Sequence, residues 1–224
     1  MAPGHRPAAR RKARAADPRA LLAPYLAAIE LHNRGGQLRR YPGSPLLALA
    51  WLRPQDRLIA CELEPAAASA LARSLAKNPR AKAIAIDGWT ALAAYVPPKE
   101  RRGLVLIDPP FEARGELDRI PEHLARAHRK WPTGIYLLWY PIKDFAQTTG
   151  FARRIAALGV PRILRAEVMI AGRNDKSLIG TGLLIVNPPW KLETELQTLL
   201  PAVAAVLRRD AQGGARLDWL TREK

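Results

Sequence analysis

Short runs of apolar residues recur along the chain from residue 57 onward, and amphipathic segments separate them. The apolar runs occupy 57–62, 81–86, 103–107 and 134–140. The amphipathic segments that separate them occupy 65–76, 90–95 and 120–129. The runs have the length of strands buried on both faces, whereas the segments repeat Ala, Leu or Ile with a helical period. Strands that alternate with helices predict a parallel sheet with helices on both faces.

The pattern changes in the last third of the chain. After a helix expected at 145–158, two apolar strands follow at 163–170 and 181–186. The loop between them is too short for a crossover helix, so we expect them to be antiparallel. A last helix is expected at 192–207, and Trp219 is expected near a frayed end.

The first third has a different character. Residues 1–16 are mostly Arg, Ala and Pro with almost no large apolar side chain, which predicts a disordered basic tail. A helix is expected at 17–33, where Asp17 can cap it and Pro18 stands at its first position. A tight loop at 41–45 then opens a helix at 46–52.

Three of the expected parallel strands end in an acid, namely Glu62, Asp87 and Asp108. Ligands bind at the carboxyl ends of such strands, so these acids should gather on one rim of the sheet. Glu62 could hold both hydroxyls of a ribose, and Asp87 could accept a hydrogen bond from an adenine amine. The alternative is that strand-end acids cap the next helix, which applies to Glu62 because Pro65 begins one. Glu64 is a near neighbour with the same chemistry.

Asp108 is followed at once by Pro109, Pro110 and Phe111, and this segment suits methylation of an exocyclic amine. Such an amine is a poor nucleophile because its lone pair is delocalised into the base. It improves when its N–H bonds are drawn to acceptors, here the Asp108 carboxylate and a carbonyl of Pro109 or Pro110, which the prolines orient. Phe111 offers a flat face for an extruded base. The alternative is a strand that simply ends in a proline turn.

Two further segments carry competing interpretations. Asn187-Pro188-Pro189-Trp190 repeats the pattern, but it follows an antiparallel strand, so we expect a structural turn there. Ser44 could face a cofactor or could cap the helix that follows it.

Charge adds a partner to this picture. The chain carries 36 Lys and Arg against 20 Asp and Glu, a formal net charge of +16, which favours nucleic acid as partner. The alternative is a genome that uses Arg and Ala freely. A single cysteine and four histidines without metal-ligand spacing predict no metal site. No apolar run is long enough for a membrane span, so we expect a cytoplasmic protein.

Several segments together resemble the bacterial 23S ribosomal RNA adenine-N6 methyltransferase family known as RlmJ. They are Asn33-Arg34, Gly36-Gln37-Leu38-Arg39, Tyr41-Pro42-Gly43-Ser44-Pro45, Glu62-Leu63, Pro65, Asp87-Gly88, Arg102-Gly103-Leu104, Asp108-Pro109-Pro110, Thr133-Gly134-Ile135-Tyr136, Trp139-Tyr140-Pro141 and Asn187-Pro188-Pro189-Trp190-Lys191-Leu192-Glu193. The resemblance extends from about residue 17 to the end. It implies a monomer that methylates adenine N6 in 23S ribosomal RNA, and S-adenosylmethionine as the methyl donor.

The resemblance also implies roles and boundaries. The residues that line the donor site would be Ser44, Glu62, Asp87, Gly88 and Asp108, and Asp108 would act at the amine with Pro109, Pro110 and Phe111. Phe111 stands where the family more often has tyrosine. Residues 17–40 would be a helical insertion subdomain, and 41–224 an incomplete methyltransferase catalytic domain.

The chain departs from the family before Glu62. The family has an N-terminal segment that touches substrate and donor, then a first strand that ends in a glycine-rich loop, and neither is found here. We therefore expect a Rossmann-like class I methyltransferase sheet that lacks its first central strand, through truncation upstream. Two alternatives stay open: a non-catalytic RNA-binding remnant, and a DNA adenine-N6 methyltransferase.

Overall fold

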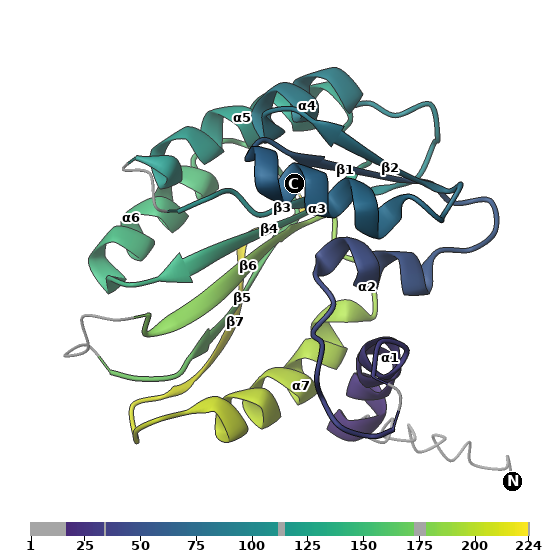
Figure 1. The fold of residues 1–224 in the computed structure, drawn as a ribbon. Helices are drawn as coiled ribbons and strands as arrows, with labels where there is room; N and C mark the ends of the chain where they lie inside the picture. Colours follow the sequence, from purple (N-terminus) through teal and green to yellow (C-terminus); the bar gives the residue numbers. More distant parts are fainter. Residues whose placement is uncertain (1–16, 34, 112–114, 173–177, 224) are drawn as a thin grey trace, which may run out of the picture.

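A computed structural model describes residues 17–33, 35–111, 115–172 and 178–223 (Figure 1). The helices are α1 (Pro18–Glu30), α2 (Ser44–Trp51), α3 (Pro65–Leu75), α4 (Gly88–Tyr95), α5 (Glu116–Lys130), α6 (Phe145–Ala156) and α7 (Leu192–Leu207). The strands are β1 (Leu58–Glu62), β2 (Ala81–Ala85), β3 (Leu104–Ile107), β4 (Ile135–Ile142), β5 (Ile163–Met169), β6 (Gly180–Val186) and β7 (Gly214–Thr221). The alternation of strands and helices expected from the sequence is therefore present as an α/β fold.

The strands form two sheets. The larger has the order β3-β4-β6-β5-β7, and the smaller is the parallel pair β1-β2. Strands β3 and β4 are parallel, whereas β6 runs antiparallel to both β4 and β5. The expected antiparallel pairing of the strands at 163–170 and 181–186 is thus confirmed, and the larger sheet is mixed.

The chain end differs from the expectation. Residues Gly214–Thr221 form β7, which pairs antiparallel with β5 and places Trp219 opposite Leu164. The indole of Trp219 packs against the cluster under α7, and its Nε1 donates a hydrogen bond to Glu193 at 2.9 Å. The expectation of a frayed end was wrong because this short segment becomes a strand only when the edge of β5 is available to pair with it.

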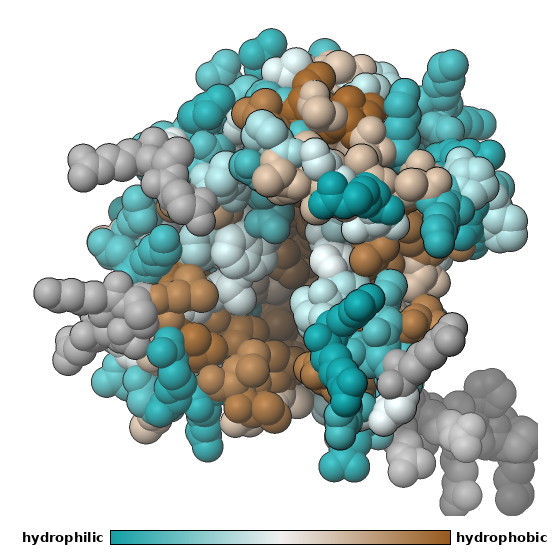
Figure 2. Space-filling view, viewed as in Figure 1, coloured by the Kyte–Doolittle hydropathy of each residue, from teal (hydrophilic) through white to brown (hydrophobic). Residues whose placement is uncertain are grey.

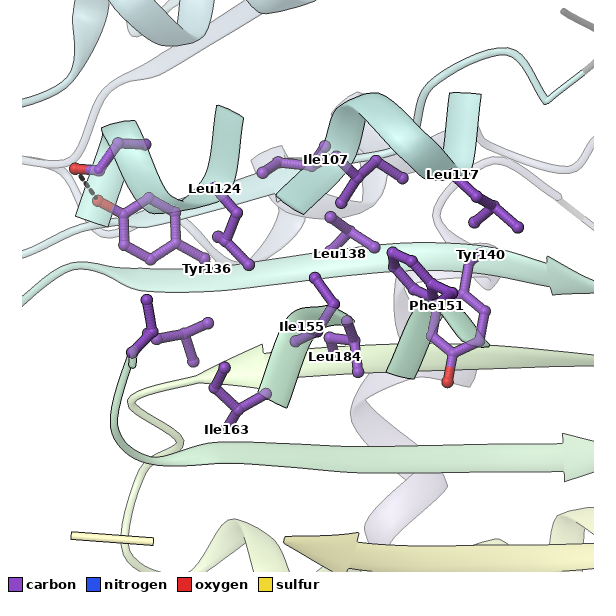
Figure 3. Close-up of a cluster of buried hydrophobic side chains, with 14 of the residues drawn as sticks. Ile107, Leu117, Leu124, Tyr136, Leu138, Tyr140, Phe151, Ile155, Ile163 and Leu184 are labelled. Atoms are coloured by element: carbon purple, nitrogen blue, oxygen red, sulfur yellow. Dashed lines mark hydrogen bonds between the residues drawn. The ribbon is translucent and has the colours of Figure 1, made fainter. Parts of the chain in front are cut away.

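Helices cover both faces of the larger sheet. The main core lies between the sheet and helices α4, α5 and α6, where fully buried side chains interdigitate (Figure 3). The other face carries Leu164, Ala166 and Ile185, which pack under leucines of α7. Helix α5 shows why the pattern produces this layer: Leu117, Ile120 and Leu124 fall on one stripe of the helix and are all buried.

The N-terminal region packs onto this framework. Helix α1 begins as expected, with the Asp17 carboxylate accepting a hydrogen bond from the Arg19 amide at 3.0 Å and Pro18 at the first position. It packs against α2 and α7. The basic tail expected at 1–16 lies outside the described residues. Among the helices of the described part, none is long and apolar enough to cross a membrane.

One edge of β1 and one edge of β3 have no strand partner in the described part of the chain. Within the described residues, β1 has only β2 as a neighbour, and β3 has only β4. Apolar side chains on these strands are open to solvent, with Leu104 59%, Leu106 44% and Ile59 47% exposed. The space-filling view shows hydrophobic surface in a hollow in the middle of the molecule (Figure 2). An interior strand edge is normally covered, because its free N–H and C=O groups need partners.

Candidate active site

Asp108 stands immediately after β3, where an apolar strand delivers it to the surface. Its carboxylate makes no hydrogen bond or ion pair with any side chain or amide in the described part of the chain. The side chain is open to solvent, yet partial desolvation by its neighbours raises the pKa of the Asp108 carboxyl. An acceptor without a partner, in a partly dry setting, is free to receive a donor from a ligand.

Phe111 lies three residues further along, half-buried against the main core. Its ring meets that of Trp139 edge to face, with the centroids 5.5 Å apart and the planes at 64°. Trp139 belongs to β4, the strand next to β3, so two strands build one aromatic corner beside Asp108. Sequence reasoning assigned no role to Trp139, although an aromatic residue in the apolar run that follows the Asp108 strand is a signal that could have found it.

Glu62 ends β1 and folds back on its own backbone. Its Oε1 accepts hydrogen bonds from the amides of Leu63 and Glu64, at 2.8 and 3.0 Å. The Glu62 carbonyl accepts a hydrogen bond from the Ile86 amide, which ties the end of β1 to the end of β2. These bonds hold the carboxylate in place and use one of its two oxygens.

Helix capping falls to other acids than Glu62. Glu64 caps α3, because its two oxygens accept from the amides of Ala66 and Ala67. Asp87 caps α4, with Oδ2 accepting from the amide and the hydroxyl of Thr90 at 2.7 and 2.8 Å. Burial alone would raise the pKa of Asp87, but the hydrogen bonds from Thr90 outweigh it and lower that pKa. Asp87 is therefore an ionised helix cap, and its Oδ1 accepts no hydrogen bond from the described residues.

Ser44 and Gly88 each begin a helix. Gly43, not Ser44, occupies the cap position of α2, and no side chain caps that helix. The capping interpretation of Ser44 was wrong, because the hydroxyl stands one residue inside the helix and is exposed. Gly88 is the exposed first residue of α4, directly after Asp87.

The parallel strands β1 and β2 end side by side, and β3 runs parallel to β4, so each of the three acids stands at the carboxyl end of its strand (Figure 1). Glu62 and Asp87 end the paired strands of the smaller sheet, and Asp108 ends the first strand of the larger sheet. This acceptor-rich rim suits hydroxyl and amine donors. Within the described residues, no group of three His, Cys, Asp or Glu side chains could hold a metal ion.

The second proline motif lies at the opposite edge. Val186 pairs with Tyr136 near the start of β4, so Asn187 follows at the amino end of that strand, away from Asp108. The side-chain amide of Asn187 donates to the carbonyls of Pro132 and Gly134, both at 2.8 Å. The backbone φ of Asn187 is 54°. These bonds make the segment the structural turn that the sequence suggested.

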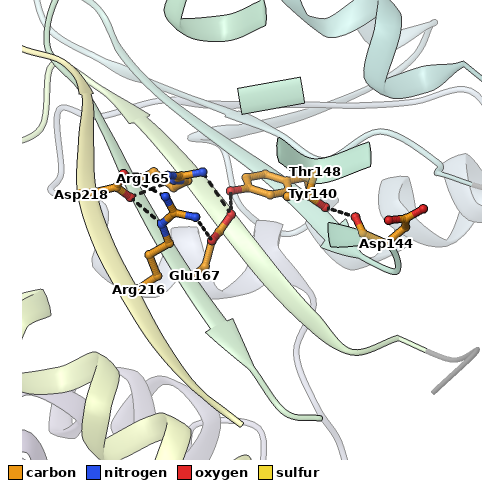
Figure 4. A network of polar contacts seen from close by, with 7 residues as sticks. All are labelled: Tyr140, Asp144, Thr148, Arg165, Glu167, Arg216 and Asp218. Carbon is orange, nitrogen blue, oxygen red and sulfur yellow. Dashed lines mark hydrogen bonds and ion pairs between the residues drawn. The ribbon is translucent and has the colours of Figure 1, made fainter. Parts of the chain in front are cut away.

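A buried polar network joins β4, β5 and β7 (Figure 4). Arg165 and Glu167 are each only 4% exposed. The Arg165 guanidinium donates to both oxygens of Asp218, at 2.9 and 2.6 Å, and the Tyr140 hydroxyl donates to Glu167 at 2.7 Å. The network fastens the edge strand β7 through β5 to β4, the strand that carries Trp139.

Known proteins share this chain's sequence and fold. The model of the family described as "Ribosomal RNA large subunit methyltransferase D, RlmJ" matches residues 6–221. The protein named ribosomal RNA large subunit methyltransferase J in Escherichia coli K12 is 36% identical over 203 residues, which are 90% of this chain and 72% of that protein. Its namesake in Haemophilus influenzae is 34% identical over 204 residues, covering 90% of this chain and 73% of that one.

A solved structure shares the fold of this chain. The crystal structure of a protein from Legionella pneumophila str. Philadelphia 1 matches with a TM-score of 0.84 and 32% sequence identity, over 89% of this chain and 74% of that one.

Proposed function

This chain belongs to the family of ribosomal RNA large subunit methyltransferases of the RlmJ type, and from that premise we propose that it methylates N6 of an adenine in 23S ribosomal RNA, in the cytoplasm, with S-adenosylmethionine as donor. The observation that carries the proposal is Asp108, a carboxylate without a partner among the described residues, at the carboxyl end of β3 and next to the aromatic corner of Phe111 and Trp139.

The donor's adenosine part fits the chemistry of the rim. The second oxygen of Glu62 is available to ribose hydroxyls, while the remaining oxygen of Asp87 and the exposed backbone at Gly88 can meet the adenine. Ser44 offers a hydroxyl at the start of α2 for the other end of the donor. When bound, S-adenosylmethionine supplies a methyl group on a sulfonium that is already activated for displacement.

The chain's own residues would prepare the amine. Asp108 accepts a hydrogen bond from one N6–H, and the carbonyl of Pro109 or Pro110 accepts the other, which draws the lone pair out of the ring. Phe111 stacks on the extruded base. This arrangement would hold N6 in line for transfer of the donor's methyl group, and the surplus N6 proton would leave to water. Positioning supplies most of the acceleration.

Replacement of Asp108 by Ala tests this assignment. We expect loss of methyl transfer to unmethylated 23S ribosomal RNA with the same melting temperature as the wild type, since the carboxylate bonds to no other described residue. Asp118→Ala is the matched control: its carboxylate is 72% exposed, and within the described residues its ion-pair partner is Arg154 alone. Transfer at the wild-type rate by Asp108→Ala would remove Asp108 from the mechanism.

A second proposal concerns the gap between the sheets. We propose that a further strand belongs between β1 and β3 and completes the Rossmann-like sheet and the donor pocket. The unpaired edges and the exposed Leu104 and Leu106 support it. The same gap favours a second candidate function, a non-catalytic RNA-binding protein.

Calorimetry with S-adenosylmethionine separates the two candidates. If the gap removes part of the donor pocket, this chain binds the donor more weakly than the Escherichia coli relative does. Equal affinity would contradict an incomplete pocket. RNA binding with no detectable donor binding would favour the non-catalytic candidate.

A further inference from the structure

A groove lies between α4 and α5, on the outer side of the main core. It encloses a cavity of about 340 Å³, and its lining includes Arg119, His123, Arg126 and Lys130, all from α5. Its floor is apolar, from Leu92 and Ala93 of α4 and Ala127 of α5. We call this feature the α4–α5 groove.

The spacing of α5 puts the four basic residues in a row. They are separated by four, three and four residues, which returns each one to the same face of a helix. From Arg119 to Lys130 this row is about 16 Å long at 1.5 Å per residue. The buried stripe of Leu117, Ile120 and Leu124 faces the core instead, so the row is presented outward.

The groove is firmly built. Trp89 of α4 stacks on His123, with the ring centroids 4.4 Å apart, and its Nε1 donates to the buried Glu116 at 2.8 Å. At the far end, Lys130 Nζ donates to the Ala93 carbonyl at 2.8 Å. These contacts hold the two helices at a set separation.

The local charges favour an anion. Arg119 is 57% exposed and lies 3.5 Å from Glu116, while Arg126 is 58% exposed and lies 3.8 Å from the exposed Glu122. Asp87 is the one carboxylate in the lining, and Thr90 holds it. The lining thus offers three cations and a neutral ring against one carboxylate, while Glu116 and Glu122, outside the lining, each pair with one of these cations.

The groove begins at the candidate active site. Asp87 belongs both to the rim and to the groove lining, and Arg119 lies in the first turns of the helix that follows the loop after Asp108. An RNA chain with a base at Asp108 would pass along this row of cations where it continues beyond the rim.

We propose that the α4–α5 groove binds the phosphate backbone of the RNA substrate beside the target nucleotide, with Arg119, Arg126 and Lys130 as the phosphate contacts. This inference rests on the proposed function. The partner is identified by its chemistry: a repeating anion that can follow a row of cations, in a protein with a net charge of +16.

The test is the salt dependence of RNA binding, measured without methyl donor. The triple variant Arg119→Gln, Arg126→Gln, Lys130→Gln should bind unmethylated 23S ribosomal RNA more weakly. The slope of log affinity against log KCl concentration should become shallower by about 2, because each contact to a single strand contributes about 0.7. Arg126→Gln alone, an exposed change that cannot unfold the helix, should remove about 0.7.

The matched control removes the same charge elsewhere. Arg73, Lys77 and Arg153 are exposed and form no ion pair within the described residues, and their triple change to Gln should leave the slope nearly unchanged. An unchanged slope in the groove variants, or an equal loss in the control, would overturn the proposal. Normal methyl transfer with an unchanged slope would reject the groove alone, whereas no RNA binding by the wild type would reject both proposals.

His123 provides a local readout. Desolvation and the charge of Arg119 lower the pKa of His123, and Arg126 lowers it further, while the carboxylates of Glu122 and Asp87 oppose this shift without reversing it. Phosphates seated on those guanidiniums would raise the pKa of His123, measured by proton NMR with an RNA oligonucleotide bound. A pKa of His123 that does not move when RNA is bound would also contradict the proposal.

Discussion

Asp108 and Glu167 are both carboxylates at or near a strand, and their surroundings give them different uses. Asp108 has no partner in the described residues, while Glu167 is buried against Tyr140 and Arg165. The sequence distinguished them only through neighbours, since Asp108 precedes two prolines and Glu167 sits inside an apolar strand. The structure shows that one is available to a ligand and the other is committed to the fold.

The pH dependence of methyl transfer should reflect Asp108. Desolvation raises the pKa of its carboxyl, so protonation begins at a higher pH than for an ordinary aspartate, near 4. The proposed role needs the ionised form, which is lost as pH falls through that raised pKa. We expect the acidic limb of the kcat profile above pH 4, measured at saturating RNA and donor. An acidic limb that persists unchanged in Asp108→Asn, at whatever residual rate, would assign it to another group.

Glu167 should matter for stability. Glu167→Ala leaves the buried Tyr140 hydroxyl and part of the Arg165 charge without a partner, so we expect a loss on the order of 3 kcal/mol in the free energy of unfolding. Urea denaturation measures it. The control is Glu122→Ala, whose pair with Arg126 is exposed and should contribute less than about 1 kcal/mol. Equal losses in the free energy of unfolding would mean that the buried network stabilises the fold no more than the exposed pair does.

At the scale of elements, β1 and β3 have the apolar sequences of interior strands, but the structure leaves one edge of each without a strand neighbour in the described residues. Among the described residues each has a strand neighbour on one side only, whereas β4 and β6 are flanked on both sides. The apolar run 103–107 indicated a strand buried on both faces. In the structure Leu104 and Leu106 are exposed, because nothing in the described residues covers that face.

Hydrogen exchange should resolve this difference. Amides on the unpaired edges of β1 and β3 lack strand partners, so peptides that span these strands should exchange faster than peptides that span β4 and β6. Mass spectrometry of the exchanged chain measures it, with β4 and β6 as internal controls. Equal protection in all four strands would mean that the free edges are covered.

For the molecule as a whole, we expect RNA affinity and methyl transfer to depend on different residues. The net charge of +16 should supply affinity for RNA through phosphate contacts, while the rim supplies the reaction. Asp108→Ala should therefore abolish methyl transfer without making the salt dependence of RNA binding shallower. Filter binding over a KCl series measures this, and a shallower slope in that variant would show that the two functions are coupled.

The sequence by itself determined the alternation of elements, the antiparallel pair at 163–170 and 181–186, and the acids that end three strands, because periodicity and strand length are local properties. Only the tertiary structure decided that Gly214–Thr221 is a strand, that Glu64 and Asp87 cap helices while Glu62 does not, and that Trp139 stands beside Phe111. It also decided that β1 and β3 each have one edge without a strand partner in the described residues. Each of these depends on residues distant in the chain, whose meeting is settled by packing and not by any local pattern.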